Sequence, residues 1–334
     1  MADVKVVEGS FQVDDGVSLF TKSWLPADGP LRAKMIMVHG FNDHVDRYYD
    51  FFPSLARRGI AVHAFDQRGW GRSVKTPADR GRSGATPAVL ADIAAFLRSH
   101  LPPEKEDGER AAEGAGGAGG ADVPVFVLGH SMGGGEVLAL ASTPQYADLI
   151  ARVRGWILEA PFLGFTPAAQ PSWLTIASGR LAAHVVPHFR LVRPIPPAHL
   201  CRDPAVQASL AADTLLHETG TLEGHAAMIG RAEDLTGGRL RPLRPQVRSL
   251  LVAHGTADAI ASFERVRAWA DEARRPSRGP DALEDLVFKA YEGWFHQLHA
   301  EPGREEFYKD VGDWILERSG GGEGLPPAAP EAKL

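Results

Sequence analysis

The residues Gly129-His130-Ser131-Met132-Gly133 match the pattern G-x-S-x-G, in which a serine hydroxyl serves as a nucleophile. An apolar run at 124–128 precedes this motif, and a helical pattern follows at 136–142. This order predicts a sharp strand-to-helix turn that holds Ser131 in a strained conformation and exposes its oxygen. Glycine is needed on both sides of the serine because a Cβ would collide with the neighbouring strand or helix. The chemistry that this motif indicates is attack on a carbonyl carbon.

A serine hydroxyl needs a base to activate it, and the base needs an acid to orient it. Downstream of Ser131, Asp258 follows the strand-like run 250–253, and His296 follows the run 286–290. The order Ser, Asp, His along the chain is that of the α/β-hydrolases. Because both residues follow strands, we expect them at the same edge of the sheet as the serine. The sequence therefore predicts Ser131 as nucleophile, His296 as base and Asp258 as orienting acid.

Three alternatives accompany this assignment. His299 is a rival base, since it lies three residues beyond His296 and can face the same cavity. Asp66 is a rival acid, but it precedes Ser131 in a glycine-rich turn, where a structural hydrogen bond is the expected role. Asp258 also has a purely structural alternative, as the N-cap of a helix that begins near Phe263.

The oxyanion that forms during attack needs two backbone N–H donors. One is the N–H of Met132, the residue after the nucleophile, and the other comes from the loop that follows the strand 35–39. Phe41 is the best-placed donor in that loop. Its side chain also has a simple interpretation as the hydrophobic floor of an acyl pocket, and the two roles are compatible.

Strand-like and helical segments alternate along most of the chain. A hairpin is expected from the alternating pattern at 4–13 and 17–24 around the turn Asp14-Asp15-Gly16. Further strands are expected at 35–39, 60–65, 124–128, 155–160, 250–253 and 286–290. Helices are expected at 48–58, 87–100, 136–142, 263–274 and 310–318. This alternation predicts an α/β fold with a mostly parallel sheet and helices on both faces.

The interval 161–246 interrupts this alternation and is rich in proline. It contains the apolar stretch 173–192 and a helix-like part at 204–235. Because it lies between two core strands, we predict an inserted cap over the edge of the sheet where ligands bind. The two parts of the hydrolase core are then 1–160 and 247–318.

Two other segments have compositions unlike the core. Residues 104–121 are charged and then almost wholly glycine and alanine, which predicts a flexible surface insertion. The segment 319–334 is rich in glycine and proline and is expected to be a flexible tail. It ends in Ala332-Lys333-Leu334, which is similar to the Ser-Lys-Leu peroxisomal signal. The tripeptide is either such a signal or the end of a tail without that role.

The composition narrows the class of protein. The chain has 334 residues, of which 44% are hydrophobic and 23% charged, as in ordinary globular proteins. The formal charge of −6 gives no electrostatic reason to expect a nucleic-acid partner. The single cysteine, Cys201, excludes an internal disulfide and a cysteine-rich metal site. No feature of the sequence specifies an oligomeric state.

The N-terminal residues, the lengths of the apolar runs and the cysteine count predict the cellular location of the protein. Residues 1–11 carry acids and no apolar core of a signal peptide, and no apolar run is long enough to span a membrane. With a single cysteine as well, an intracellular location is expected, in the cytoplasm, with the peroxisome as the alternative.

With these residues assembled, the chain resembles the monoacylglycerol lipase group of serine α/β-hydrolases, particularly its fungal members. The matching stretches are HGFNDH (39–44), YYDFFP (48–53), FDQRGWGRS (65–73), GHSMGG (129–134), HGTAD (254–258) and HQLHAE (296–301). They span nearly the whole core. The cap is weakly matched, and the insertion at 104–121 is not part of the family pattern.

The resemblance implies roles for further residues. Ser131, Asp258 and His296 would be the catalytic triad, and the family's polar contacts to the glycerol head would fall on Asp43, Arg47 and His299. Aspartate stands at position 43, where the family often has glutamate, and its side chain is one methylene shorter. The family needs no metal and no organic cofactor.

The activity implied is hydrolysis of monoacylglycerols to glycerol and free fatty acid through an acyl-enzyme intermediate. The alternative is a lysophospholipase or broad-specificity carboxylesterase with the same triad, in which Arg190 or Arg193 holds a phosphate. The apolar stretch 173–192, with Phe162 and Phe165, is expected either to line an acyl tunnel and touch a membrane or lipid droplet, or to pack within the cap. A ligand-binding receptor without turnover is the alternative from another class, although such proteins usually lack a triad member.

Overall fold

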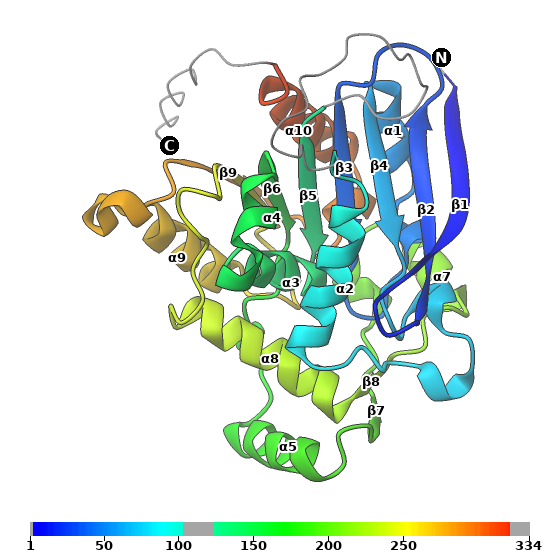
Figure 1. Cartoon of the computed structure of the whole chain (residues 1–334). Helices are drawn as coiled ribbons and strands as arrows, with labels where there is room; N and C mark the ends of the chain where they lie inside the picture. Colours follow the sequence, from blue (N-terminus) through cyan, green and yellow to red (C-terminus); the bar gives the residue numbers. More distant parts are fainter. Residues whose placement is uncertain (1–2, 103–122, 321–334) are drawn as a thin grey trace.

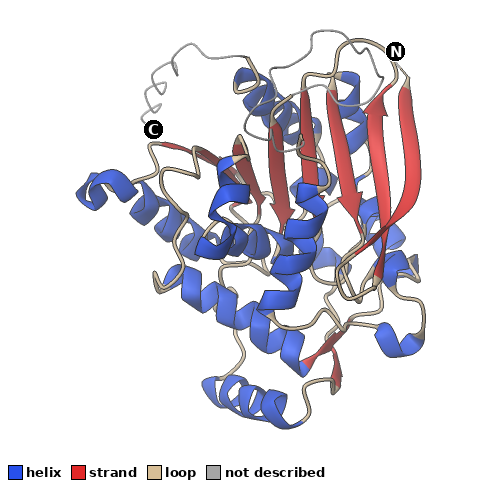
Figure 2. Cartoon of the chain, in the orientation of Figure 1, coloured by secondary structure: helices blue, strands red, loops and turns tan. Residues whose placement is uncertain are grey.

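The computed structural model describes residues 3–102 and 123–320 (Figure 1). The predicted insertion at 104–121, most of the predicted tail and the tripeptide Ala332-Lys333-Leu334 lie outside the described residues. The described part forms one layer of strands with helices on both of its faces (Figure 2). This architecture confirms the predicted fold class.

The central sheet has eight strands in the order β1-β2-β4-β3-β5-β6-β9-β10. Their bounds are β1 Val4–Gln12, β2 Ser18–Pro26, β3 Ala33–Val38, β4 Ile60–Phe65, β5 Val125–His130, β6 Gly155–Glu159, β9 Ser249–Gly255 and β10 Asp285–Tyr291. The strand β2 pairs antiparallel with both of its neighbours, and all the pairs from β4 to β10 are parallel. The carboxyl ends of these parallel strands therefore meet at one edge.

The parallel strands are buried on both faces, and their residues divide between two cores. In β3, Met35 and Met37 point into one hydrophobic cluster, and Ile36 and Val38 point into the other. Successive side chains of a strand face opposite sides of a sheet, so a continuous apolar run serves both cores at once. This is why β3 shows no alternation of apolar and polar residues.

Helices fill the two cores. The cluster that contains Met35 includes residues of α1 Phe51–Arg57 and α10 Glu305–Glu317. The cluster that contains Ile36 includes residues of four core helices: α2 Thr86–Arg98, α3 Met132–Leu140, α4 Ala147–Ala151 and α9 Phe263–Arg274. Short 3-10 helices lie at Val45–Tyr48, Gly71–Ser73, Pro77–Asp79, Pro144–Tyr146, Pro276–Asp281 and Leu298–Ala300. The last helix begins at Glu305, before the predicted segment 310–318. Its first turn contains the acidic residues Glu305 and Glu306, which the apolar pattern does not mark.

The elements between β6 and β9 lie at the carboxyl edge of the sheet (Figure 1). They are α5 Trp173–Val185, β7 Arg190–Val192, α6 Pro197–Leu200, α7 Pro204–Ala212, β8 Thr219–Thr221 and α8 Leu222–Thr236. The part predicted as one helix-like stretch at 204–235 contains two helices. They are separate because Asp213 ends α7 and the Thr221 hydroxyl caps α8 by accepting a hydrogen bond from Gly224 N–H.

The two longest helices of this region are packed differently. Leu222, Arg231, Ala232 and Leu235 of α8 are buried, and Leu235 joins one of the two main cores. By contrast, α5 has no buried residue and projects away from the sheet (Figure 1). Across the described residues, no helix is both long and apolar enough to cross a membrane.

Candidate active site

Ser131 sits on the sharp turn between β5 and α3. Its φ of 53° and ψ of −117° lie in a region that side chains other than glycine rarely adopt. A Cβ on Gly133 would collide with the carbonyl oxygens of Val38 and His39, and one on Gly129 would collide with the backbone of Gly133. The two glycines therefore allow the strand and the helix to approach closely, and this close packing holds the serine in its strained conformation.

The structure brings the three predicted triad residues together. The Oγ atom of Ser131 lies 2.8 Å from Nε2 of His296, and Nδ1 of His296 lies 2.7 Å from Oδ2 of Asp258. All three residues are buried, and they come from the ends of β5, β9 and β10. A carboxylate only accepts hydrogen bonds, so Nδ1 carries the proton and Nε2 is left to accept the serine proton.

Asp258 is held as a carboxylate. Burial raises its pKa, but the nearby His296 charge and the hydrogen bonds from His254 and His296 outweigh burial, so the pKa lies well below its usual range. Its Oδ1 atom also accepts hydrogen bonds from the backbone N–H groups of Ile260 (2.7 Å) and Ala261 (3.0 Å). Asp258 is not the N-cap of α9, since Ser262 fills that position.

The two residues predicted to supply the oxyanion donors line the cavity beside Ser131. Phe41 and Met132 both line this cavity, and nothing in the described part of the chain accepts a hydrogen bond from either N–H. The preceding residue, Gly40, lies so close that a Cβ on it would be 3.0 Å from the Cβ of Ser131. This arrangement offers the two donors that an oxyanion requires.

The rival residues have other partners. The Nδ1 atom of His299 lies 2.7 Å from Oε1 of Glu159. Asp66 accepts hydrogen bonds from the backbone N–H groups of Val45 (2.9 Å) and Arg72 (2.6 Å), which is the structural role expected of it. The geometry thus favours His296 and Asp258 over both rivals.

A buried polar cluster lies behind the triad. Among the described residues, His130, Glu159 and His299 form a group of potential metal ligands, with ligand atoms within 4.8 Å of one another. The His299 ring already donates a hydrogen bond to Glu159, and its ring lies 4.2 Å from that of Tyr48. Burial lowers the pKa of His130 to about 4, so this histidine is neutral at pH 7. Within the group, Glu159 accepts hydrogen bonds from the backbone N–H (3.0 Å) and the ring of His299, and these bonds support the loop that carries His296.

The three residues predicted to bind glycerol are not gathered at the cavity. Asp43 lies at its wall but is only 4% exposed, and its carboxylate accepts hydrogen bonds from Tyr48 Oη (2.7 Å) and the His44 backbone N–H (2.8 Å). His299 is fully buried in the polar cluster and is not part of the cavity wall. The prediction that both residues reach substrate therefore has no geometric support, because each is already engaged by buried partners.

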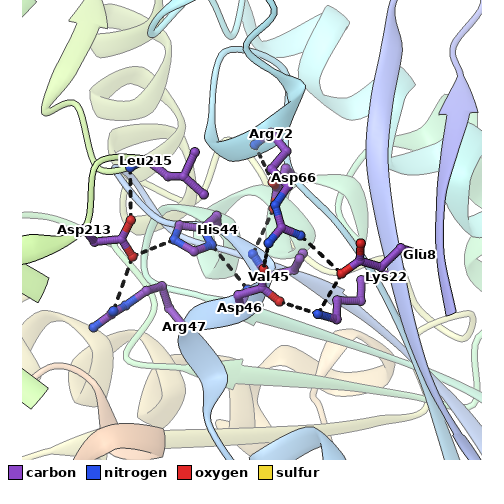
Figure 3. A network of polar contacts seen from close by, with 10 residues as sticks. All are labelled: Glu8, Lys22, His44, Val45, Asp46, Arg47, Asp66, Arg72, Asp213 and Leu215. Carbon is purple, nitrogen blue, oxygen red and sulfur yellow. Dashed lines mark hydrogen bonds and ion pairs between the residues drawn. The ribbon is translucent and has the colours of Figure 1, made fainter. Parts of the chain in front are cut away.

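Arg47 is also placed differently from the prediction. Its guanidinium donates hydrogen bonds to Tyr49 Oη (2.6 Å), Ser209 Oγ (2.9 Å) and Asp213 Oδ2 (3.3 Å). Asp213 lies at the end of α7, so Arg47 ties the core to the cap (Figure 3). Both terminal nitrogens of this buried arginine bind protein acceptors, and the residue does not line the cavity.

The triad opens into a cavity of about 640 Å³, which is within the range of small-molecule sites. Its wall is mostly apolar, and Phe162, Ile176, Met228 and Ile229 are among the residues that line it. The other lining residues include several polar ones: Asn42, Arg180, Arg193, His199, Asp213, Glu218, His225 and Gln297. Such a cavity suits a ligand with a long apolar part and a small polar part.

Two further polar residues support the triad. His254, at the end of β9, is expected from the sequence to be a local hydrogen bonder, and its Nε2 atom lies 3.1 Å from Oδ2 of Asp258. Glu159, at the end of β6, is not predicted from the sequence, and it accepts hydrogen bonds from the backbone N–H and the ring of His299. A polar residue at the end of an otherwise apolar strand is the signal that could have identified Glu159.

The comparisons with known proteins agree with this geometry. Residues 29–303 match the family described as Serine aminopeptidase, S33 (Hydrolase_4). A putative monoglyceride lipase of Schizosaccharomyces pombe is 30% identical over 306 residues, which cover 90% of this chain and 72% of that protein. A monoacylglycerol lipase of Mycolicibacterium smegmatis is 27% identical over 92% of this chain and 96% of its own length.

A solved structure shares the fold. It is a soluble variant of monoglyceride lipase from Saccharomyces cerevisiae, with a TM-score of 0.76 and 19% identity, covering 95% of this chain and 97% of that one. At 19% identity, this structural match shows the fold alone. The family match and the Schizosaccharomyces pombe relative show that the chain belongs to the Hydrolase_4 serine hydrolases and, among them, to the monoacylglycerol lipase family.

Proposed function

We propose that this protein hydrolyses the ester bond of monoacylglycerols and releases glycerol and a free fatty acid. The observation that carries the proposal is the Ser131–His296–Asp258 arrangement at the floor of a mostly apolar cavity of about 640 Å³. Family membership supports the same substrate class, since the relatives are named as monoglyceride or monoacylglycerol lipases.

The mechanism proposed follows from the hydrogen bonds. His296 Nε2 takes the proton of Ser131 Oγ as that oxygen attacks the ester carbonyl, and the oxyanion accepts hydrogen bonds from the N–H groups of Phe41 and Met132. His296 then protonates the departing glycerol oxygen, which leaves an acyl group on Ser131. Water, deprotonated by His296, hydrolyses this acyl-enzyme and regenerates the serine. Asp258 stabilises the charged imidazole throughout.

The test compares three lipids that share one acyl chain with two substrates that lack this chain. The panel contains a long-chain monoacylglycerol, the matching triacylglycerol and lysophosphatidylcholine, with a short p-nitrophenyl ester and an aminoacyl anilide added because the family description names a peptidase. The expected result is the highest kcat/KM on the monoacylglycerol and no turnover by Ser131→Ala. Equal or better turnover of the lysophospholipid, the short ester or the anilide would contradict the assignment.

We also propose that the outer face of α5 and the chain after it make peripheral contact with a membrane or lipid droplet. This α5 face consists of exposed apolar residues: Trp173, Leu174, Leu181, Val185, Val186, Phe189 and Val192. Helical spacing directs Leu174, Leu181 and Val185 to one side, opposite Ile176 and Gly179, which line the cavity. Exposed apolar patches of this kind mark interaction sites, and a lipid substrate must leave its bilayer or droplet next to the cavity.

Co-sedimentation with phosphatidylcholine vesicles tests this contact. Leu181→Ser combined with Val185→Ser should lower vesicle binding by at least about tenfold, because two large apolar side chains no longer leave water. Hydrolysis of a short soluble ester should be unchanged. The matched control combines Val6→Ser with Val287→Ser, two exposed valines on the edge strands. Equal binding of both double variants would exclude the α5 face.

A further inference from the structure

His225 lines the cavity, and its ring has an unpaired hydrogen-bond acceptor. It lies in α8, and its Nδ1 atom is 2.9 Å from the backbone carbonyl oxygen of Thr221. A carbonyl oxygen only accepts, so Nδ1 carries the hydrogen, and in the neutral ring Nε2 is then an acceptor. Throughout the described ranges, no group donates a hydrogen bond to this Nε2. The tautomer is thus fixed by the protein, and the acceptor is available to a ligand.

The surroundings of His225 keep its ring neutral. Burial lowers its pKa, and the nearby positive charge of Arg193 lowers it further, against the opposing effect of the hydrogen bond to Thr221. The ring occupies the space left by the missing side chain of Gly220, where a Cβ would collide with it. It also lies edge-on to Phe41, with 5.4 Å between ring centroids. The acceptor is therefore both neutral and held in place.

The cavity has a polar end, and His225 belongs to it. The Oδ1 atom of Asn42 accepts a hydrogen bond from Glu218 N–H at 2.7 Å, and the Glu218 carbonyl oxygen accepts one from Arg193 N–H at 2.7 Å. Arg193 is in turn close enough to His225 to influence its charge. Asn42 follows Phe41 in the chain, and the Phe41 ring contacts His225, so the polar end adjoins a residue that is expected to stabilise the oxyanion.

Beyond His225, the wall of the cavity along α8 is apolar. Met228, three residues beyond His225, packs with the Phe162–Phe165 pair, whose ring centroids are 4.7 Å apart. Ala232, a further turn along α8, belongs to the same cluster. Because an acyl chain has no hydrogen-bond donor, it suits this end. The alcohol half of the ester then falls at the polar end.

We infer that His225 is a specificity-determining residue whose Nε2 accepts a hydrogen bond from a free hydroxyl of the alcohol half of the substrate. The inference rests on the proposed function, since it concerns the same cavity and the same ester. An ester whose alcohol lacks a hydroxyl leaves this acceptor unpaired and displaces the water that would otherwise serve it. Sites built around such a hydrogen bond reject analogues that lack the donor.

The experiment measures kcat/KM on 1-monooleoylglycerol and on methyl oleate in the same mixed micelles. His225→Leu removes the acceptor, and His225→Gln restores one through its amide oxygen. The matched control is His184→Leu. His184 makes the same kind of hydrogen bond, from Nδ1 to the carbonyl oxygen four residues back (2.8 Å to Arg180), but it is exposed on α5 and does not line the cavity. Active enzyme is counted with a fluorophosphonate probe.

The expected result is a specific change in preference. His225→Leu should lower the ratio of kcat/KM for the monoacylglycerol to that for the methyl ester about tenfold, the size of one lost hydrogen bond. His225→Gln should recover most of the ratio, and His184→Leu should leave it unchanged. An unchanged ratio in His225→Leu, or an equal fall on both esters, would overturn the inference and leave His225 as packing for Phe41.

The two proposals fail in different ways. Wild-type enzyme that hydrolyses the monoacylglycerol, with a ratio insensitive to His225→Leu, would overturn only the role of His225. Wild-type enzyme that prefers methyl oleate would overturn the proposed function and, with it, the hydroxyl preference that His225 is inferred to supply.

Discussion

At the scale of single residues, Asp258 connects the fold to the chemistry. One oxygen contacts His296 and His254, and the other is held by two backbone N–H groups. The carboxylate is therefore oriented by the loop before it orients the histidine. Oδ1 therefore has a structural role, and Oδ2 contacts the catalytic histidine.

Asp258→Asn should lower kcat by about four orders of magnitude with little change in KM. The amide cannot hold His296 in the tautomer that accepts the serine proton, whereas substrate contacts are untouched. Folding should survive, because the amide oxygen can still accept from Ile260 and Ala261. Steady-state kinetics and the melting temperature check this, with Asp271→Asn on the exposed face of α9 as control. A loss smaller than tenfold would remove Asp258 from the triad.

At the scale of elements, a buried ion pair joins the nucleophile helix to the cap. Arg231 of α8 donates from one nitrogen to Oε1 of Glu136 in α3 (3.0 Å) and from another to Oγ1 of Thr86 in α2 (3.1 Å). Both charged residues are at most 4% exposed. The wall of the cavity formed by α8 is thereby held against the helix that follows Ser131, whereas α5 has no buried residue and joins α8 through an exposed pair, Arg180 with Glu233.

Glu136→Gln should change how stability depends on pH. Burial, only partly offset by the Arg231 charge, raises the pKa of Glu136 from 4.5 to about 7. Between these values the folded protein binds more protons than the unfolded chain, so this residue's contribution to stability falls as pH rises. The free energy of unfolding of the variant, relative to wild type, should therefore increase between pH 5 and pH 8, by at most about 3 kcal/mol.

Urea unfolding at the two pH values measures this difference. Glu233→Gln is the control, since Glu233 lies on the same helix but its side chain is 46% exposed and pairs with Arg180. A relative stability of Glu136→Gln that is the same at pH 5 and pH 8 would show that Glu136 stays ionised beside Arg231.

At the scale of the whole molecule, a polar network runs from the edge strand to the cap (Figure 3). Glu8 of β1 pairs with Lys22, which also contacts Asp46 (2.8 Å). The next residue along the chain, Arg47, contacts Asp213 at the end of α7. His44 reaches Asp213 as well, at 2.9 Å. The loop that carries Phe41 is thus connected just downstream to α7.

Arg47→Met should loosen this side of the cap. Its three acceptors lose a buried donor, and we expect the free energy of unfolding to fall by about 1–3 kcal/mol. Limited proteolysis should cut the segment around α7 faster than in wild type. The control is Arg57→Met, because Arg57 makes an exposed ion pair with Asp50 on the same side of the core. Equal protection of the two variants would mean that the network does not hold the cap.

The strands of the sheet, the sharp turn at Ser131 and the order of the triad residues could all be predicted from the sequence. Apolar runs such as 60–65 mark strands because burial on both faces demands them, and the glycines around Ser131 mark the turn because nothing larger fits. Residues placed directly after such strands must meet at one edge. These patterns depend on short segments of the chain, so they can be recognised without knowledge of the tertiary contacts.

Only the tertiary structure decided which polar residues meet. His296 and His299 are three residues apart, yet one ring turns to Ser131 and the other to Glu159. Two of the three acceptors of Arg47, on Ser209 and Asp213, lie more than 160 positions further along the chain. Buried polar groups take the partners that packing brings to them, and those partners are set by distances between distant segments, which no local pattern records.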